Sequence, residues 1–218
     1  MTDRRSRGFY ERRVFPWLND RLATGPELER LRAATLTDAT GRVLEIGFGS
    51  GASLPHYPAG VREIVAVDPN TGMHHLAAPR IDRCPFPVTA LVAEAEFLPL
   101  TSATIDTAVS ILTLCSVSDP RRVLGELRRV LRPGGRLILL EHGLSNDPGV
   151  ARWQQRLNRV QNVIACGCNH NRAVADLVAA SGFYWLELKQ FYAPGIPRTH
   201  GWITAGTART SDTRSLRD

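Results

Sequence analysis

Short apolar runs alternate with amphipathic stretches along most of this chain. Five runs, most of them bounded by glycine, proline or aspartate, predict strands at residues 42–46, 63–68, 88–93, 107–112 and 136–141. Their continuous apolar character is typical of parallel strands that are buried on both faces of a sheet. Because the strands alternate with helical stretches, the pattern predicts an α/β fold with a doubly wound, mostly parallel sheet.

Two helices and a C-terminal hairpin complete the predicted elements. One helix is expected at 120–131, where Asp119 can cap the first turn, and another at 172–181, ended by Gly182. Two strand-like runs at 184–191 and 200–208 are joined by a loop rich in proline and glycine. They predict an antiparallel C-terminal hairpin at the edge of the sheet.

The length of 218 residues fits one main domain, since single hydrophobic cores stay efficient up to about 250 residues. We expect an N-terminal helical lid or docking segment at 1–40, the main domain at 41–208 and a disordered tail at 209–218. In the first segment, apolar residues recur near helical spacing at Tyr10, Val14, Trp17, Leu18 and Leu22. Packing over the sheet or a lid is favoured there over a membrane-surface helix.

The charge pattern narrows the class of partner. The formal net charge is +6, and arginines crowd both ends of the chain. A solvated charge run is the favoured explanation, and peripheral membrane contact through the basic N-terminus stays open. No basic patch is interleaved with aromatic residues, so no nucleic-acid partner is expected. No membrane-spanning run or secretory signal is visible, which predicts a cytoplasmic location.

The four cysteines do not form a pattern typical of disulfides or of zinc. Cys84, Cys115, Cys166 and Cys168 are expected as free thiols, with Cys115 and Cys168 most simply read as small buried hydrophobes. The spacing of Cys166 and Cys168 is too tight for the usual zinc-binding pair. We therefore expect no metal.

The most informative segment is an apolar strand that runs directly into alternating glycines, Gly47, Gly49 and Gly51. Glycines let the backbone turn sharply and approach a ligand at the carboxyl ends of the strands. The next predicted strand ends in Asp68, where a carboxylate can accept both hydroxyls of a ribose. The combination predicts a nucleotide-type ligand.

Glu45 disfavours an ordinary dinucleotide dehydrogenase. A carboxylate beside the glycine turn is unfavourable for a pyrophosphate, and the glycine spacing also differs from the dinucleotide pattern. A cationic ligand suits the Glu45 carboxylate better. S-adenosyl-L-methionine carries a sulfonium and an ammonium group, so it fits such a turn.

From about Gly41 to Glu141 the chain resembles the class I S-adenosylmethionine-dependent methyltransferases, which have a Rossmann-like fold. The resemblance implies that Glu45, Gly47, Gly49 and Gly51 wrap the methionine part of the cofactor. It implies that Asp68 holds the ribose, that Glu94 lies near the adenine amine, and that Ala95 contributes its backbone. The main domain is accordingly expected to be a methyltransferase domain.

A narrower resemblance covers most of the chain. The segments 112–117, 141–142 and 153–155, and the pattern Gly167-Cys168-x-x-x-Arg172, look like the branch that contains the mammalian alkyl-thiol methyltransferases of membranes and small bacterial relatives. Leu112 joins the expected cofactor site on this basis. Phe48 and His170 depart from the branch, where a small and an aliphatic residue are usual.

His142 is the candidate catalytic residue, because it follows the fifth strand at the ligand end of the sheet and titrates near neutrality. A positioning role is an equal alternative. Trp153 is expected in an acceptor-pocket wall or in the core. The expected function is methyl transfer to a small-molecule acceptor, a thiol or an amine rather than carbon. The alternatives are a lipid or quinone methyltransferase at a membrane surface, a non-catalytic adenosyl-ligand binding protein, and a nucleotide-cofactor oxidoreductase.

Overall fold

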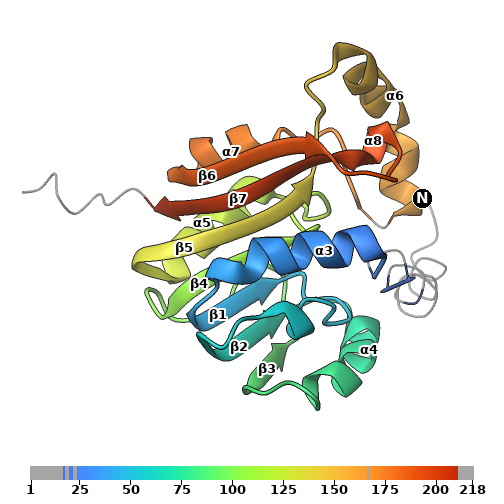
Figure 1. Cartoon of the computed structure of the whole chain (residues 1–218). Helices are drawn as coiled ribbons and strands as arrows, with labels where there is room; N and C mark the ends of the chain where they lie inside the picture. The colour runs from blue at the N-terminus through green and yellow to red at the C-terminus, as the bar shows by residue number, and fades with distance from the viewer. Residues whose placement is uncertain (1–16, 18–19, 22–23, 166, 211–218) are drawn as a thin grey trace, which may run out of the picture.

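A computed structural model describes residues 17, 20–21, 24–165 and 167–210. Its centre is a seven-stranded sheet in the order β3-β2-β1-β4-β5-β7-β6 (Figure 1). The first five strands are parallel, and β7 pairs antiparallel with both β5 and β6. The strands are β1 (Gly41–Ile46), β2 (Val61–Val67), β3 (Val88–Leu91), β4 (Ile105–Ile111), β5 (Leu131–His142), β6 (Phe183–Tyr192) and β7 (Trp202–Thr210).

Helices cover both faces of the sheet. The α-helices are α3 (Pro26–Thr35), α4 (Thr71–Ile81), α5 (Pro120–Val130), α6 (Pro148–Ile164), α7 (Val174–Ala180) and α8 (Arg198–Gly201), and two short 3-10 turns are η2 (Leu36–Asp38) and η3 (Leu54–His56). Figure 1 shows α3 in front of the sheet, α5 and α7 behind it, and α6 beyond the sheet.

The buried strands supply two apolar cores because successive side chains point to opposite faces. In β1, Leu44 packs in a core with residues of α5 and α7, whereas Val43 packs in the other core with Leu31 of α3 and Ala77 of α4. All four side chains are buried. Both faces of the parallel strands are therefore apolar, as their continuous hydrophobic runs predict.

The predicted doubly wound sheet, its five parallel strands and its antiparallel C-terminal pair are confirmed. The pair enters the sheet in reverse order, with β7 inside and β6 at the edge. Strand β5 begins at Leu131 rather than at 136, because Leu131 already pairs with Ile105 of β4. The preceding helix consequently ends at Val130, and Asp119 caps it by accepting from the backbone N–H groups of Arg121 and Arg122.

Several expectations for the chain ends fall on residues outside the described part. Of the apolar N-terminal positions only Trp17 is described, and it is exposed. The tail was expected from 209, but β7 continues to Thr210 because Arg209 pairs with Arg136 of β5; residues 211–218 and Cys166 lie outside the description. Among the described helices, none is long and apolar enough to cross a membrane.

Candidate functional site

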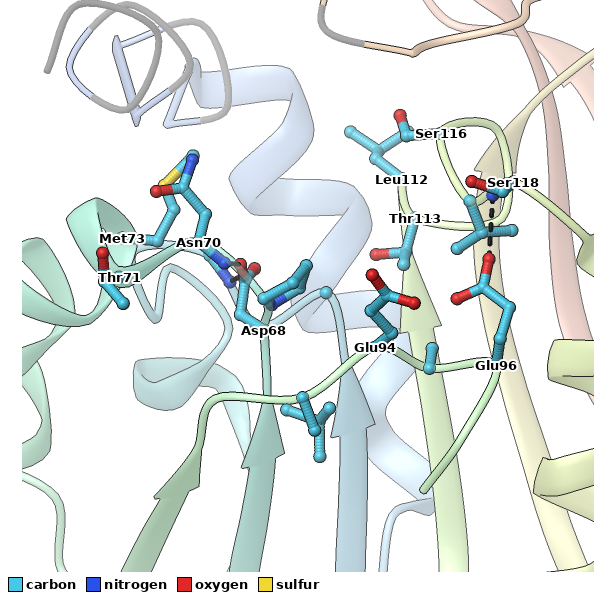
Figure 2. A pocket seen from close by; sticks show the side chains of 17 residues that line it. Asp68, Asn70, Thr71, Met73, Glu94, Glu96, Leu112, Thr113, Ser116 and Ser118 are labelled. Carbon is cyan, nitrogen blue, oxygen red and sulfur yellow. Dashed lines mark hydrogen bonds between the residues drawn. The ribbon is translucent and has the colours of Figure 1, made fainter. Parts of the chain in front are cut away.

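A cavity of about 540 Å³ opens at the carboxyl ends of β1, β2 and β4. This is the point where the strand order reverses, which is the usual ligand position in an open α/β sheet. Figure 2 shows Asp68 and Asn70 on one side of the cavity and Glu94 and Thr113 on the other. The lining residues are Gly47, Gly49, Val67, Asp68, Pro69, Asn70, Thr71, Met73, Ala93, Glu94, Ala95, Glu96, Leu112, Thr113, Ser116, Val117 and Ser118.

Two glycines form one wall of this cavity and have different constraints. Both adopt left-handed backbone angles, with φ of 61° at Gly47 and 58° at Gly49. A Cβ on Gly47 would collide with the side chain of Thr113, whereas the nearest heavy atom to a Cβ on Gly49 is the Gly47 carbonyl oxygen at 3.8 Å. Gly47 is therefore required by packing, and Gly49 leaves room on its open side.

Asp68 is buried where β2 ends and is anchored by backbone donors. Its Oδ2 accepts a 2.9 Å hydrogen bond from the N–H of Gly49, and its Oδ1 accepts a 2.8 Å bond from the N–H of Asn70. Burial raises the pKa of Asp68 despite these two bonds. The carboxylate is thus fixed in the cavity wall, with further lone pairs available to a ligand.

Glu45 and Gly51 do not line the cavity. Glu45 is buried below the glycine turn, where its carboxylate accepts a 2.9 Å hydrogen bond from the hydroxyl of Tyr57. Burial raises its pKa to about 7, although hydrogen bonds from Ser53 and Tyr57 oppose the shift. A Cβ on Gly51 would lie 3.1 Å from the ring of Phe48, so this glycine serves packing.

The segment after β3 supplies the opposite wall. Glu94 is exposed, Ala95 is buried, and both line the cavity. Glu96 accepts a 2.9 Å hydrogen bond from the backbone N–H of Ser118 (Figure 2) and a 3.2 Å bond from the N–H of Asp119. This carboxylate joins the loop after β3 to the start of α5.

Leu112 lies in the lining with a φ of 52°, a strained conformation for a residue other than glycine.

The buried carboxylate of Glu141 holds the residues that follow Leu112. Its Oε1 accepts hydrogen bonds from the N–H groups of Thr113 at 2.8 Å and Leu114 at 3.0 Å, and from the Ser110 hydroxyl at 2.7 Å. Burial raises the pKa of Glu141. This carboxylate holds the turn that follows β4 against the end of β5.

His142 lies outside the cavity lining and faces two cysteines. Its Nε2 is 3.2 Å from Cys168 Sγ, and its Nδ1 is buried without a hydrogen-bond partner in the described part of the chain. Burial lowers the pKa of His142, but the hydrogen bond with Cys168 and the nearby charge of Glu141 outweigh burial, so the net shift is upward. Cys115 and Cys168 are buried free thiols, as predicted.

Asp20 connects the N-terminal segment to the glycine turn. Its carboxylate accepts a hydrogen bond from the hydroxyl of Ser50 and forms a 3.0 Å ion pair with Arg80 of α4. Arg80 also donates a 2.8 Å hydrogen bond to the carbonyl of Ser50. The described end of the N-terminal segment therefore contacts the back of the turn that carries Gly49.

Of the predicted cofactor residues, the structure brings six to one cavity: Gly47, Gly49, Asp68, Glu94, Ala95 and Leu112. Sequence reasoning missed Asn70, Thr71 and Met73, which begin α4. Asn70 could have been found from sequence, because asparagine is a preferred residue at the start of a helix. In the structure it caps α4 by accepting a hydrogen bond from the N–H of Gly72. Trp153 was expected in an acceptor-pocket wall or the core. It is 56% exposed on α6 and lines a separate cavity of about 350 Å³ instead of this one.

Comparison with known proteins identifies the family. Residues 44–139 match the family model described as a methyltransferase domain. Over 165 residues the chain is 32% identical to the ubiquinone/menaquinone biosynthesis C-methyltransferase UbiE of Syntrophotalea carbinolica, covering 73% of this chain and 67% of that protein. It is 31% identical over 156 residues to the human thiol S-methyltransferase TMT1A, covering 70% of this chain and 64% of the relative. The chain thus spans less than two thirds of that thiol methyltransferase.

The fold agrees with solved methyltransferases. A structure of an S-adenosylmethionine-dependent methyltransferase from Thermotoga maritima superposes with a TM-score of 0.66 over 94% of this chain and 100% of that one, at 22% identity. The two chains therefore share the architecture of the sheet and its helices.

Proposed function

Because the chain belongs to the class I S-adenosylmethionine-dependent methyltransferases, we propose that it methylates a small-molecule acceptor, with a thiol or an amine favoured. The enzyme class and the cofactor, S-adenosyl-L-methionine, follow from the family. The identity of the acceptor is the proposed part. The observation that carries the site assignment is the open side of Gly49 facing the same cavity as the fixed carboxylate of Asp68.

The residues in the cavity fit this cofactor. A side chain at position 49 would enter the open space beside the turn, so glycine leaves that space for a ligand. We assign Gly47 and Gly49 to the methionine part, Asp68 to the ribose hydroxyls, and Glu94, Ala95 and Leu112 to the adenosine end. When bound, the cofactor would supply a methyl group on a positively charged sulfonium, whose sulfur leaves as a neutral thioether.

The chain's own contribution is then mainly positional. Asp68 and the glycine turn fix the donor, and the turn at 113–118 that Glu141 and Glu96 secure provides the wall nearest the acceptor. Holding reactants in line at near-attack distance supplies several kcal/mol of the barrier reduction, about 7 to 11 in well-oriented model systems. A thiol that arrives as a thiolate requires no protein base, which agrees with the position of His142 outside the lining.

A methyl-transfer screen tests the acceptor class. The full chain would be incubated with methyl-labelled S-adenosylmethionine and panels of alkyl thiols, amines and quinols, and the labelled products would be identified. We expect labelling in the thiol or amine panel. Labelling of quinols alone would contradict the proposal, and cofactor binding without transfer to any panel would favour a non-catalytic binding protein. The matched control is the Asp68→Ala variant, which should label every acceptor less when the cofactor is held near its wild-type dissociation constant.

A second candidate, a lipid or quinone acceptor at a membrane surface, is favoured by α6. Only Gln154 of this 17-residue helix is buried. Three arginines and no carboxylates occur in the helix, at positions 152, 156 and 159. Its exposed large apolar side chains are Trp153, Leu157, Val160, Val163 and Ile164. A basic helix with an exposed apolar stripe is typical of interfacial binding.

Vesicle sedimentation tests this candidate. We expect the chain to bind vesicles containing anionic lipid more strongly than purely zwitterionic vesicles, and we expect Arg152→Gln with Arg156→Gln to weaken that binding. Replacing the exposed Arg83 and Arg121, which lie on other surfaces, is the matched control. Equal binding by both double variants would exclude α6 as the contact. The cytoplasmic location stays a prediction.

A further inference from the structure

Three side chains that are far apart in the sequence meet beside the end of β5. Cys115 follows β4, His142 ends β5, and Cys168 lies in the turn after α6. Cys115 Sγ, Cys168 Sγ and one ring nitrogen of His142 all lie within 4.8 Å of one another. From this geometry we propose that the three residues form a binding site for a thiophilic divalent cation of the zinc type.

The spacing of the three atoms suits such an ion. Zinc bonds of about 2.3 Å to sulfur and about 2.0 Å to nitrogen place tetrahedral ligand atoms about 3.5 to 3.8 Å apart. The distance between Cys168 Sγ and His142 Nε2 is 3.2 Å, and the group as a whole fits within 4.8 Å. Small side-chain movements would therefore admit the ion without rearrangement of the strands.

The backbone on both sides of the cluster is held in place. The Asn169 N–H donates a 2.8 Å hydrogen bond to the Cys115 carbonyl, and the Asn169 side-chain amide donates a second one at 3.2 Å. Arg172 donates to the carbonyls of Leu114 and Val117. These bonds join the turn after β4 to the turn after α6, so the two cysteines are presented together before any ion arrives.

The charges of the proposed site balance. Both thiols lose a proton on binding, so two thiolates neutralise a divalent cation and the imidazole adds no charge. A hydrogen bond with Cys115 and burial raise the pKa of the Cys168 thiol well above its ordinary value, so the ion must displace a firmly held proton there. Nε2 of His142 faces Cys168 Sγ at 3.2 Å, so in the tautomer that carries its proton on Nδ1 the Nε2 lone pair points toward that sulfur, as ligation requires.

Three protein ligands leave one tetrahedral position open, which is the pattern of zinc sites that bind a further ligand. Cys115 lies in the segment 112–118, whose members Leu112, Thr113, Ser116, Val117 and Ser118 line the cavity. The ion would therefore stiffen the wall that we assign to the acceptor. Ligation through Nε2 and proton transfer by the same atom exclude each other, so this proposal competes with a general-base role for His142.

Metal titration of the full chain tests the site. Protein stripped with a chelator and kept reduced would be titrated with Zn²⁺ against a chromophoric competitor, and with Co²⁺ followed by absorption. We expect one ion per chain, with a dissociation constant of about 1 μM or tighter. Cobalt should give a thiolate charge-transfer band and the intense visible absorption of a tetrahedral complex. Absence of that spectrum in the wild-type protein would overturn the proposal without depending on any variant.

Variants locate the ligands. Cys115→Ser, Cys168→Ser and His142→Gln should each weaken Zn²⁺ binding at least about 100-fold, as expected for loss of one of three ligands. Cys84→Ser, which removes a free thiol far from the cluster in sequence, is the matched control and should bind as the wild type does. Unchanged affinity in Cys115→Ser or His142→Gln would overturn the site. A Cys115–Cys168 disulfide in the freshly reduced protein, seen by mass spectrometry, would do the same. These outcomes are independent of which acceptor is methylated.

Discussion

Asp68 Oδ2 accepts a 2.9 Å hydrogen bond from the N–H of Gly49, so the carboxylate at the end of β2 and the glycine turn after β1 form one connected wall. The same carboxylate accepts from Asn70 at the start of α4. The turn after β1, the end of β2 and the start of α4 are thus joined at a single side chain. A change at Asp68 would affect both the expected ribose contact and the turn beside it.

Replacing Asp68 with alanine should weaken cofactor binding. One or two hydrogen bonds from a charged acceptor contribute about 1.5 to 3 kcal/mol each, so the dissociation constant of S-adenosylmethionine should rise about tenfold to several hundredfold. Isothermal titration calorimetry measures this dissociation constant. Asp176→Ala, which removes an exposed carboxylate on α7, is the control and should leave affinity unchanged. Unaltered binding in the Asp68 variant would place the ribose elsewhere.

Alanine at Gly47 and alanine at Gly49 should affect different properties. Both variants place a side chain at a left-handed φ, which costs about 1 to 2 kcal/mol. The Gly47 variant adds a collision with Thr113 and should unfold at a distinctly lower temperature. The Gly49 variant meets nothing close and should fold, but lose at least about tenfold in cofactor affinity. Thermal melting and calorimetry on both proteins decide; normal affinity in folded Gly49→Ala would move the donor away from the turn.

Much of this wall follows from sequence, because it depends on local rules. A strand entering alternating glycines and a second strand ending in Asp68 place both features at the carboxyl edge of a parallel sheet. The Asp119 cap and the buried apolar face of α5, formed by Val123, Leu124, Leu127 and Val130, follow likewise from neighbouring residues. The predictions failed where pairing with a distant strand determined the result, as at Leu131, which joins β5 because Ile105 lies opposite it.

The roles of Glu45, His142 and α6 depend on tertiary contacts. The glycine turn suggested that the Glu45 carboxylate faces a ligand, but Tyr57, twelve residues later in the chain, binds it instead. Nothing near His142 in sequence indicates that Cys168 lies against its ring. The apolar stripe of α6 was not predicted as a helix, and its exposure could not be inferred from a pattern that usually indicates a buried face.

Glu45 should make stability depend on pH. Its pKa is about 7 in the folded protein and 4.5 ordinarily, so the folded state holds the proton more tightly. The contribution of Glu45 to the free energy of unfolding is fully present below about pH 4.5 and is lost as pH rises through about 7. The difference between the two pKa values corresponds to about 3 kcal/mol of unfolding free energy, at about 1.4 kcal/mol per pKa unit.

Denaturant unfolding of the ligand-free protein at pH 5, 6, 7 and 8 measures this dependence. In Glu45→Gln the loss with rising pH should be smaller by up to about 3 kcal/mol, while Asp68 and Glu141, whose pKa values burial also raises, keep a residual slope of the same sign. Glu63→Gln, at a half-buried carboxylate on β2 that forms an ion pair with Arg42, should give a profile parallel to the wild type. A parallel profile for Glu45→Gln would contradict the assignment.

His142→Gln should leave the dissociation constant of S-adenosylmethionine within about twofold of the wild type, because His142 lies outside the cavity lining. We expect turnover of a thiol acceptor to fall less than about tenfold, since Nε2 is directed at Cys168 and a thiolate needs no base. Loss of a true general base would lower the rate about 100-fold to 10,000-fold, and more for acceptors that must shed a proton. Single-turnover rates for thiol and amine acceptors across pH, on chelator-treated protein, distinguish the two. A loss beyond 100-fold that is confined to protonated acceptors would establish His142 as the base and contradict the role inferred from its position.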